Sequence, residues 1–374
     1  MMQQAAVLEE AGGSLRIVDD LEIDQPRRGE ALVALDAAGV CGSDLAVLKG
    51  SAPHPMPVVL GHEATGRIVA RGDDDEPEPG LASGNRVILW LRPPCRACRM
   101  CIRGDAGLCE RSGNMSVRGT LLDGRTSFSR AGQPVYRGLG IGAFTTQVVM
   151  PLAGLVPVPD DIPVEVAALL GCGVATGAGA VLNVARPQVG DAVMVFGAGG
   201  VGLAAAMLAA ASGAGAVIIV DPAEHRREAA LTLGATHALE GGDRNALRAQ
   251  LRDALGATAI DVAIDAVGRS ALVELGYRSI RQGGTVVAVG LQGGNEVVSL
   301  PGPLVPLSHK RVLGCFMGGI DPQRDLPRLF ALHRRGVFPV DRLVSARRPL
   351  TEVGAALDDL ANARGLRTVV QLAP

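Results

Sequence analysis

Four cysteines lie close together in a segment rich in proline, glycine and arginine. They are Cys95, Cys98, Cys101 and Cys109, with the spacing C-x₂-C-x₂-C-x₇-C. Four thiolates this close in sequence can form a tetrahedral S₄ site, which suits Zn²⁺. Because a cysteine occupies every position, no coordination place stays open, and we expect a structural site. Three alternatives stay open: a four-cysteine iron–sulfur centre, a pair of disulfides if the protein is secreted, and a zinc module that binds nucleic acid.

A second set of metal-binding side chains is spread through the sequence. Cys41, His62 and Cys172 each adjoin a glycine and lie outside the four-cysteine cluster. Taken singly, each cysteine is most simply a small buried residue, and the histidine a surface or hydrogen-bonded one. Taken together, two thiolates and one imidazole make a three-ligand set that leaves a fourth place open for water or substrate. Their occurrence beside a nucleotide-binding motif favours the joint interpretation.

That motif is a glycine-rich turn between a predicted strand at 193–196 and a predicted helix at 203–214. Gly197, Gly199 and Gly202 have the spacing G-x-G-x-x-G. Such a turn lets the backbone approach a pyrophosphate, and the helix N-terminus supplies N–H groups to it. Asp221 ends the next apolar run, where a carboxylate would accept the ribose hydroxyls and repel a 2′-phosphate. The sequence therefore predicts NAD rather than NADP. The alternative, a chance turn in a chain with 50 glycines, leaves Asp221 unexplained.

Composition limits the class of protein. The 374 residues suit two domains, and 48% hydrophobic but only 2% aromatic residues predict aliphatic cores. The net charge of −2 argues against nucleic acid or an acidic membrane surface as a partner. We find neither an apolar run of about 20 residues nor a signal-peptide pattern, and expect a cytoplasmic protein without a membrane span. Seven cysteines in that compartment indicate metal binding or catalysis rather than disulfides.

The order of predicted elements indicates two kinds of architecture. Residues 5–40 alternate short apolar runs with turns, which predicts a mostly antiparallel β beginning. From about residue 174 strands alternate with helices, the pattern of a doubly wound parallel sheet. After about residue 313 we expect two amphipathic helices and a last strand. The acidic run at 73–78 is expected to be a solvated loop. The expected segments are strands at 86–91, 192–196, 216–221, 259–268, 283–290 and 366–372, and helices at 223–234, 325–336 and 350–365.

Together these motifs resemble a zinc-dependent alcohol dehydrogenase of the medium-chain dehydrogenase/reductase family. The resemblance spans essentially the whole chain and implies an α/β protein. Residues 1–173 and 314–374 would form a β-rich, GroES-like catalytic domain, and 174–313 a Rossmann NAD-binding domain with a doubly wound parallel sheet. The segments that carry the resemblance are Cys41-Gly42-Ser43-Asp44, Gly61-His62-Glu63, the four-cysteine cluster, Gly171-Cys172-Gly173, the glycine-rich turn and Asp221.

The resemblance also implies roles for individual residues. Alcohol dehydrogenase is known for its Cys₂His ligand set, so Cys41, His62 and Cys172 would bind a catalytic zinc. The four-cysteine cluster would bind a structural zinc, which makes two Zn²⁺ per chain. Asp44 would orient the ring of His62, and Glu63 would lie close to the metal and exchange in as a transient ligand.

The remaining implied roles concern the substrate and the cofactor. Ser43 would bind the substrate hydroxyl and pass its proton outward, while Thr176 and Val201 would press on the nicotinamide. Arg367 resembles an arginine that contacts the pyrophosphate. Arg226 is expected at the adenosine edge, although it equally suits a solvated helix start. The residues expected to bind NAD are Gly197, Gly199, Gly200, Val201, Gly202, Asp221, Arg226, Val289 and Arg367.

Departures from the family pattern bear on the reaction. Gly42 removes an arginine that anchors the pyrophosphate in some relatives. Ala46 stands where a histidine often ends the proton relay, so the relay from Ser43 would run through the cofactor ribose to water or another base. Cys172 as third ligand favours simple alcohols over polyols, and Leu91 suits an apolar substrate.

The sequence thus predicts an NAD-dependent enzyme that interconverts an alcohol and an aldehyde or ketone by hydride transfer. The alternatives are a pathway-specific dehydrogenase of a sugar, cyclitol or other functionalised alcohol, and a non-catalytic protein that binds NAD or zinc. Oxidation of a glutathione adduct of formaldehyde is disfavoured by Gly42. A homodimer or homotetramer is expected, with a small-molecule alcohol, aldehyde or ketone as substrate. Cys315 is expected to be a packed core thiol.

Overall fold

The computed structural model describes residues 1–72, 78–256 and 260–372. The chain divides into two compact units. The first unit comprises Met1–Gly173, Asp321–Phe330 and Leu343–Pro374, and the second comprises Val174–Ile320 and Ala331–Arg342. The solvated loop expected at 73–78 lies, apart from Glu78, outside the described residues. No helix in the described part of the chain is long and apolar enough to cross a membrane.

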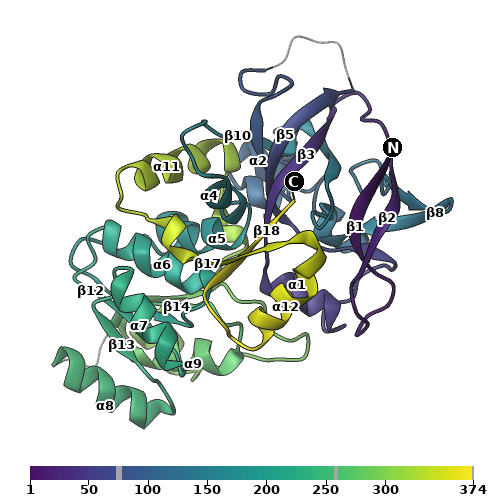
Figure 1. The fold of residues 1–374 in the computed structure, drawn as a ribbon. Coiled ribbons are helices and arrows are strands. Elements are labelled where there is room, and N and C mark those ends of the chain that lie inside the picture. Colours follow the sequence, from purple (N-terminus) through teal and green to yellow (C-terminus); the bar gives the residue numbers. More distant parts are fainter. Residues whose placement is uncertain (73–77, 257–259, 373–374) are drawn as a thin grey trace. The chain divides into compact units, whose positions relative to one another are not determined.

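Part of the first unit is a small closed barrel (Figure 1). Its strands pair in the order β1, β2, β7, β8 and β4, and β4 closes the ring on β1. From Asp20 to Ile23, β2 alternates half-buried and buried residues, as expected for a strand with one face on a core. The barrel strands are β1 (Met2–Leu8), β2 (Arg16–Ile23), β4 (Val58–Val59), β7 (Phe128–Arg130) and β8 (Gln133–Arg137).

The second sheet of the first unit brings distant parts of the sequence to one edge. β3 is central, and its Gly39 lies opposite Glu63 of β5 and Val369 of β18. A Cβ at Gly39 would collide with the side chains of Glu63 and Arg367, which explains the glycine. In the described residues this sheet contains β3 (Glu30–Gly39), β5 (Glu63–Arg71), β6 (Arg86–Leu89), β9 (Gln147–Pro151), β10 (Leu155–Pro157), β17 (Val344–Pro349) and β18 (Arg367–Gln371).

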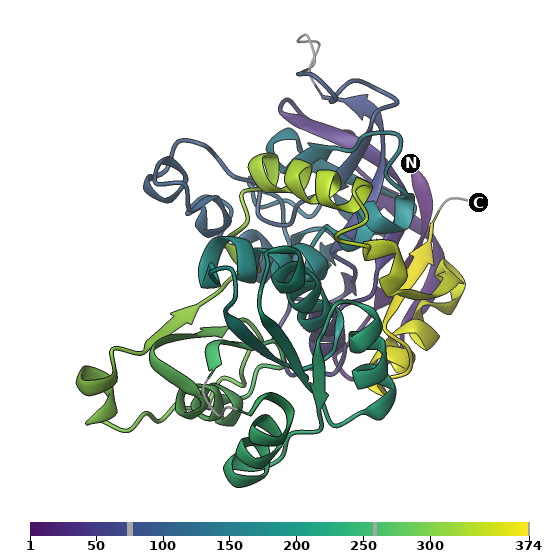
Figure 2. The same ribbon diagram turned by 90° about the vertical axis from the view of Figure 1, so that its left-hand side faces the viewer.

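The second unit contains a parallel sheet, which can be followed in teal and green in Figures 1 and 2. Every pair of neighbouring strands is parallel, in the order β13, β12, β11, β14, β15 and β16. The central strands are nearly fully buried, as expected when helices cover both faces. The strands are β11 (Ala192–Phe196), β12 (Ala216–Val220), β13 (His237–Leu239), β14 (Ile260–Asp265), β15 (Ile280–Ala288) and β16 (Arg311–Gly314).

The helices connect these strands and, in two cases, contain residues of both units. Those two are α5 (Gly173–Gly179) and α11 (Pro322–Arg334). The first unit also has α1 (Gly42–Leu48), α2 (Arg99–Ile102), α3 (Met115–Arg118), α4 (Val164–Leu169) and α12 (Val353–Ala361). The second has α6 (Gly200–Ala211), α7 (Glu224–Thr232), α8 (Arg244–Leu255), α9 (Ser270–Ser279) and α10 (Leu304–Ser308). Short 3-10 segments and a π-helical segment at Ala180–Ala185 also occur in the described part of the chain.

The predicted fold class is confirmed: the protein is a mixed α/β structure with a barrel-containing β unit and an all-parallel sheet. The core of the second unit is aliphatic, as the composition predicted. Met194, Ile218, Leu247 and Ile260 are buried there among other apolar side chains.

Candidate active site and zinc centres

Cys41 and Asp44 are positioned by the first turn of α1. Cys41 follows β3 and caps the helix, and its backbone N–H donates to Asp44 Oδ2 at 3.3 Å. The Asp44 N–H donates in return to the Cys41 carbonyl at 3.2 Å. Asp44 is fully buried, so its carboxylate needs such partners. These hydrogen bonds in the first turn of α1 therefore fix Cys41 and Asp44 relative to one another.

The Asp44 carboxylate also fixes His62. Asp44 Oδ1 accepts from the backbone N–H of Gly61 and from His62 Nδ1, both at 2.9 Å. Because the carboxylate accepts, Nδ1 carries the proton and Nε2 is left to bind a metal. Gly61 has φ of +91°, and a Cβ there would lie 2.8 Å from the Phe144 backbone nitrogen. A glycine is therefore required immediately before the histidine.

Four potential ligands meet around this point. One ligand atom from each of Cys41, His62, Glu63 and Cys172 lies within 4.8 Å of the others. Glu63 begins β5 and accepts from the Gly173 backbone N–H at 3.0 Å. Its other oxygen is paired with the Arg367 guanidinium. The structure thus brings together the predicted ligands with Asp44 and Arg367, all within the first unit.

The electrostatics of this cluster favour a bound cation. A hydrogen bond from the Cys172 thiol lowers the pKa of Cys41 well below its ordinary value. Burial alone would lower the pKa of His62, but Asp44 and Cys41 outweigh it and raise that pKa well above its ordinary value. Burial raises the pKa of Glu63 to about 7, although Arg367 acts in the opposite direction. Buried sulfur, nitrogen and carboxylate donors this close together form a donor set that fits Zn²⁺.

The remaining residues predicted to contact the substrate or the nicotinamide lie in three separate segments. Ser43 is half-buried in the first turn of α1, between Gly42 and Asp44. Leu91 follows β6 and is 6% exposed. Thr176 lies in α5 and belongs to the second unit.

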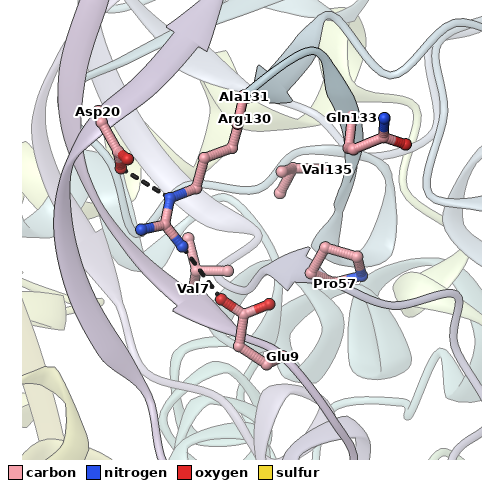
Figure 3. A pocket seen from close by; sticks show the side chains of 8 residues that line it. All are labelled: Val7, Glu9, Asp20, Pro57, Arg130, Ala131, Gln133 and Val135. Atoms are coloured by element: carbon pink, nitrogen blue, oxygen red, sulfur yellow. Dashed lines mark hydrogen bonds and ion pairs between the residues drawn. The ribbon is translucent and has the colours of Figure 1, made fainter.

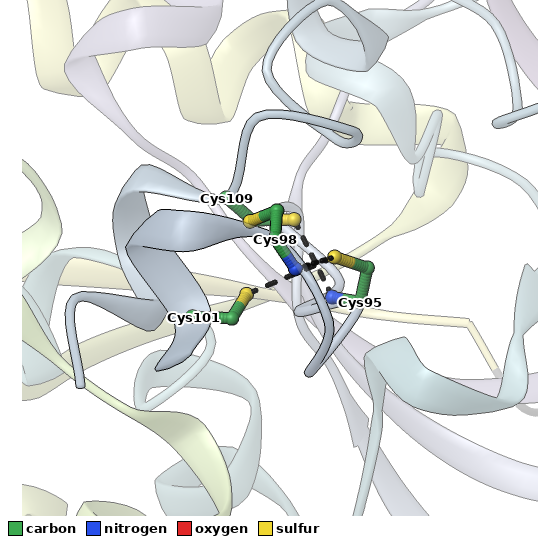
Figure 4. Close-up of side chains that lie close together, drawn as sticks. All are labelled: Cys95, Cys98, Cys101 and Cys109. Atoms are coloured by element: carbon green, nitrogen blue, oxygen red, sulfur yellow. Dashed lines mark hydrogen bonds between the residues drawn. The ribbon is translucent and has the colours of Figure 1, made fainter. Parts of the chain in front are cut away.

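The four-cysteine cluster forms a second candidate metal centre (Figure 4). The four sulfur atoms lie within 4.8 Å of one another, and none of the seven cysteines, all of them described, forms a disulfide. Backbone N–H groups of Cys95 and Cys98 donate to sulfur atoms of the cluster at 3.4 and 3.3 Å. Although burial alone would raise it, hydrogen bonds from Ser112 and from the Cys95 backbone lower the pKa of Cys109 to about 6. Hydrogen bonds lower the pKa of Cys98 as well, and four thiols of which two are already acidified fit a closed tetrahedral metal site.

The glycine-rich turn in the second unit has the geometry of a dinucleotide cradle. Gly197 directly follows β11 with φ of +93°, and Gly199 caps α6. A Cβ at Gly202 would collide with the Gly197 carbonyl, whereas a Cβ at Gly199 would meet nothing within 4 Å. Gly200 and Val201, in the first turn of α6, are half-buried. The turn is therefore packed against its own helix on one side and open on the other.

Asp221 is attached to this turn. Its Oδ2 accepts from the Ala198 backbone N–H at 2.7 Å, and its Oδ1 accepts from the Ala223 N–H at 2.9 Å. Five residues further on, the Arg226 Nε is buried and has no hydrogen-bond partner among the described residues. A buried donor without a partner, in the helix that follows Asp221, fits a ligand with hydroxyl or phosphate oxygens.

Asp265 is a functional candidate that the sequence analysis missed. It ends β14, is fully buried, and its carboxylate accepts from the N–H groups of Val267 and Gly268 at 3.0 and 3.1 Å. Its carbonyl accepts from Val289 and Gly290 at 3.0 and 2.9 Å. Burial raises its pKa. Asp265 therefore fixes the backbone that follows β14 and the backbone of Val289, which follows β15. Its position at the end of an apolar run, like that of Asp221, was the available signal.

A hollow elsewhere in the first unit contains none of the predicted site residues (Figure 3). Its prominent charge is Arg130, whose guanidinium donates to Asp20 at 2.7 Å and to Glu9 at 3.2 Å. Two carboxylates surround this one guanidinium, so the lining carries a net negative charge and offers no unpaired cation to a ligand.

Two protein-family models match the chain. The model of the alcohol dehydrogenase GroES-like domain matches residues 27–160, and the model of the zinc-binding dehydrogenase matches residues 200–334.

Relatives and solved structures match it over nearly its full length. The NDMA-dependent alcohol dehydrogenase of Amycolatopsis methanolica is 35% identical, with 99% of each chain covered. The geraniol dehydrogenase of Castellaniella defragrans is 35% identical, over 98% of this chain and 97% of its own. The crystal structure of benzyl alcohol dehydrogenase from Acinetobacter calcoaceticus has a TM-score of 0.91 and 29% identity, with 100% of both chains covered.

Proposed function

The chain belongs to the zinc-binding alcohol dehydrogenases of the medium-chain dehydrogenase/reductase family, and we propose that it interconverts an alcohol and an aldehyde or ketone with NAD as hydride carrier. The family has a four-cysteine structural site and a catalytic site of cysteine, histidine and glutamate, and both donor sets are present here. The observation that carries the proposal is the buried set of Cys41, His62 and Cys172 oriented by Asp44.

We propose two zinc ions per chain. Cys41, His62 and Cys172 would hold the catalytic ion, with Glu63 as a fourth, exchangeable donor. Zinc at such a site lowers the pKa of a bound alcohol and polarises a bound carbonyl. The four cysteines of Figure 4 would hold the second ion, with no place left for substrate.

The chain's own side chains orient the reactants and move the proton. Asp44 keeps His62 in the tautomer that leaves Nε2 for the metal. Ser43, in the same turn as Cys41, would accept a hydrogen bond from the alcohol and take its proton. Ala46, one turn later, supplies no base, so a proton taken up by Ser43 would have to leave toward water or another base. Thr176 would press on the nicotinamide and hold one face toward the substrate.

Specificity for NAD over NADP rests on Asp221. Its carboxylate is held at the glycine turn by Ala198, where a 2′-phosphate would meet like charge. We expect Asp221→Ala to raise the KM for NAD by about tenfold and to improve the use of NADP. Glu228→Ala, on the exposed side of α7, is the matched control and should leave both constants unchanged. A wild-type enzyme that uses NADP as well as NAD would contradict the assignment.

Two further groups are proposed to hold the cofactor. Arg226 would use its unpartnered Nε at the adenosine ribose. Arg367, paired with Glu63, also has a buried Nε without a partner among the described residues, and would use it on a pyrophosphate oxygen. Hydride transfer itself is the chemistry of the nicotinamide, which the protein only orients.

We propose an apolar alcohol as the substrate. The nearly fully buried Leu91 supports this, and so do the relatives named for geraniol and benzyl alcohol. The test is NAD-dependent turnover over a panel of geraniol, benzyl alcohol, ethanol, sorbitol and inositol. We expect the highest kcat/KM with geraniol or benzyl alcohol. Preference for sorbitol or inositol would contradict the substrate class. Zinc and NAD binding without turnover of any alcohol would contradict the enzymatic function.

Domain roles and assembly are also proposed. Residues 1–173 and 314–374 would form the catalytic domain and 174–313 the NAD-binding domain. The compact units support most of this division, whereas 314–320 and 331–342 cluster with the NAD-binding part. We also propose a homodimer or homotetramer. Exposed Leu291, Val297 and Leu307 support it, because apolar side chains gathered along one segment favour a protein contact. A single-chain mass by light scattering would contradict this assembly.

A further inference from the structure

An arginine in the four-cysteine loop has a backbone conformation that ordinarily favours glycine. Arg96 lies between Cys95 and Cys98 with φ of +56°. This left-handed conformation is costly for a residue with a side chain, because Cβ crowds the neighbouring carbonyl. Such a cost persists where the surrounding structure uses the side chain. We therefore expect the Arg96 side chain to make contacts that compensate for the strained backbone.

Its guanidinium makes a two-pronged ion pair with a residue far along the sequence. Nη1 donates to Asp321 Oδ2 at 2.6 Å, and Nη2 donates to Asp321 Oδ1 at 2.8 Å. Asp321 is 12% exposed in its side chain, whereas Arg96 is 46% exposed. Two parallel charge-assisted bonds fix direction as well as distance, which a single contact does not. Both residues belong to the first unit.

Asp321 in turn organises the first turn of α11. It directly precedes the helix, whose first residue is Pro322, and its Oδ1 accepts from the Gln323 backbone N–H at 3.3 Å. Its own N–H donates to Oδ2 of the fully buried Asp325 at 3.0 Å. A residue that caps a helix in this way controls where the helix begins.

A second side chain ties the same turn to the first unit. Gln323 Nε2 donates to the carbonyl of Leu155 in β10 at 3.0 Å. The chain enters the first unit at Asp321 and leaves it after Phe330. The segment 321–330 is therefore held at two points. Gln323 bonds to strand β10, and Asp321 pairs with Arg96 in the loop of the four cysteines.

We propose that Arg96 is a positioning residue that couples metal binding at the four cysteines to the order of the first turns of α11. When a metal holds Cys95 and Cys98, the backbone between them is fixed in the strained conformation that directs Arg96 toward Asp321. When the metal leaves, the loop relaxes and the ion pair loses its geometry. Thiolates around a divalent ion also carry net negative charge, which keeps the guanidinium beside the loop. Metal binding at the four cysteines would then also order the first turns of α11, which goes beyond the proposed function.

Amide hydrogen exchange of residues 322–330 in the full-length protein tests this coupling. Chelation of zinc should speed exchange there by about fivefold, the upper range for a partly exposed ion pair. Arg96→Gln should speed it by the same factor in the zinc-loaded protein, and chelation should then add nothing. Cys172→Ser, which loses only the catalytic metal, should leave this segment unchanged.

Three control variants separate coupling from a general loss of stability. Gln323→Ala removes the hydrogen bond to β10, so it should speed exchange of residues 322–330. Chelation of zinc should then speed that exchange further. Arg103→Gln removes an ion pair with Asp105 inside the cysteine loop and should leave the segment unchanged. Arg96→Gly relieves the backbone strain but removes the guanidinium, and should match Arg96→Gln rather than the wild type.

Coupling must also act in the reverse direction. Asp321→Asn, which changes no residue of the loop, should weaken zinc binding at the four cysteines by about the same fivefold factor in chelator competition. Equal exchange of residues 322–330 with and without zinc, or unchanged competition in Asp321→Asn, would overturn the inference. A wild type that carries no zinc on the four cysteines would instead overturn the metal content proposed above.

Discussion

At the scale of single residues, the catalytic centre depends on one buried carboxylate. Asp44 accepts from the Cys41 backbone, the Gly61 backbone and His62 Nδ1, so it fixes two ligand-bearing segments at once. The ligands themselves could be predicted from the sequence, because metal chemistry selects residue types. The Arg96–Asp321 pair could not, because it joins residues that only the fold brings together. Strand register likewise decides that Arg367 meets Glu63.

Removing the Asp44 charge should weaken zinc binding at Cys41, His62 and Cys172. In Asp44→Asn an amide replaces the carboxylate, so His62 loses its charged acceptor and its preferred tautomer. We expect metal affinity at this site to fall by about 10- to 100-fold, the usual effect of losing such a partner. Competition with a chromophoric chelator measures it. Asp105→Asn, an exposed change, is the control, and wild-type affinity in Asp44→Asn would contradict the role.

Cys315 should behave as an inert thiol until the solution is strongly alkaline. It is 8% exposed, and burial raises its pKa to about 11, so the reactive thiolate is scarce near neutral pH. In the zinc-loaded protein the alkylation rate should rise about tenfold per unit between about pH 8 and 10, without a plateau. Cys315→Ser should abolish this labelling. A rate that levels off by about pH 9.5 would show an ordinary thiol and contradict the burial argument.

At the scale of elements, local sequence predicted which segments are helix or strand better than where they end. The helix expected at 325–336 begins earlier, at Pro322, because Asp321 caps it. The strand expected at 86–91 ends at Leu89. Such ends depend on caps and pairing partners that lie elsewhere in the chain. The glycine turn was predictable because the φ of Gly197 and the close packing at Gly202 require glycine.

Two glycines of that turn should respond differently to the same change. Gly202→Ala places a methyl group against the Gly197 carbonyl and should lower both the unfolding midpoint and NAD affinity. Gly199→Ala meets no protein atom within 4 Å, so the fold should keep its midpoint. The methyl group would instead occupy the side left open for pyrophosphate, and NAD affinity should fall by about tenfold or more. Thermal unfolding and NAD titration distinguish the two. Unchanged NAD affinity in Gly199→Ala would contradict the cradle.

At the scale of the whole molecule, the composition and the alternation of elements were enough to predict an α/β protein with two architectures. Strand order was not predictable, because the pairing of β3 with β18 joins residues more than 300 positions apart. Neither was the clustering of 314–320 and 331–342 with the second unit, because the sequence analysis assigned all of 314–374 to the catalytic domain. Both follow from packing of apolar faces after the local elements have formed. The metal-ligand motifs can nevertheless be recognised without the topology, because the ligand residue types and their spacing are present in the sequence itself.

The central claim is an open zinc centre at Cys41, His62 and Cys172 beside a closed one at the four cysteines. Zinc content per chain, paired with NAD-dependent turnover of benzyl alcohol, tests it most directly in the wild type and Cys172→Ser. We expect about two zinc ions in the wild type, falling to about one in the variant with turnover lost. About one zinc in the wild type, unchanged in Cys172→Ser, would leave only the four-cysteine site and contradict the account.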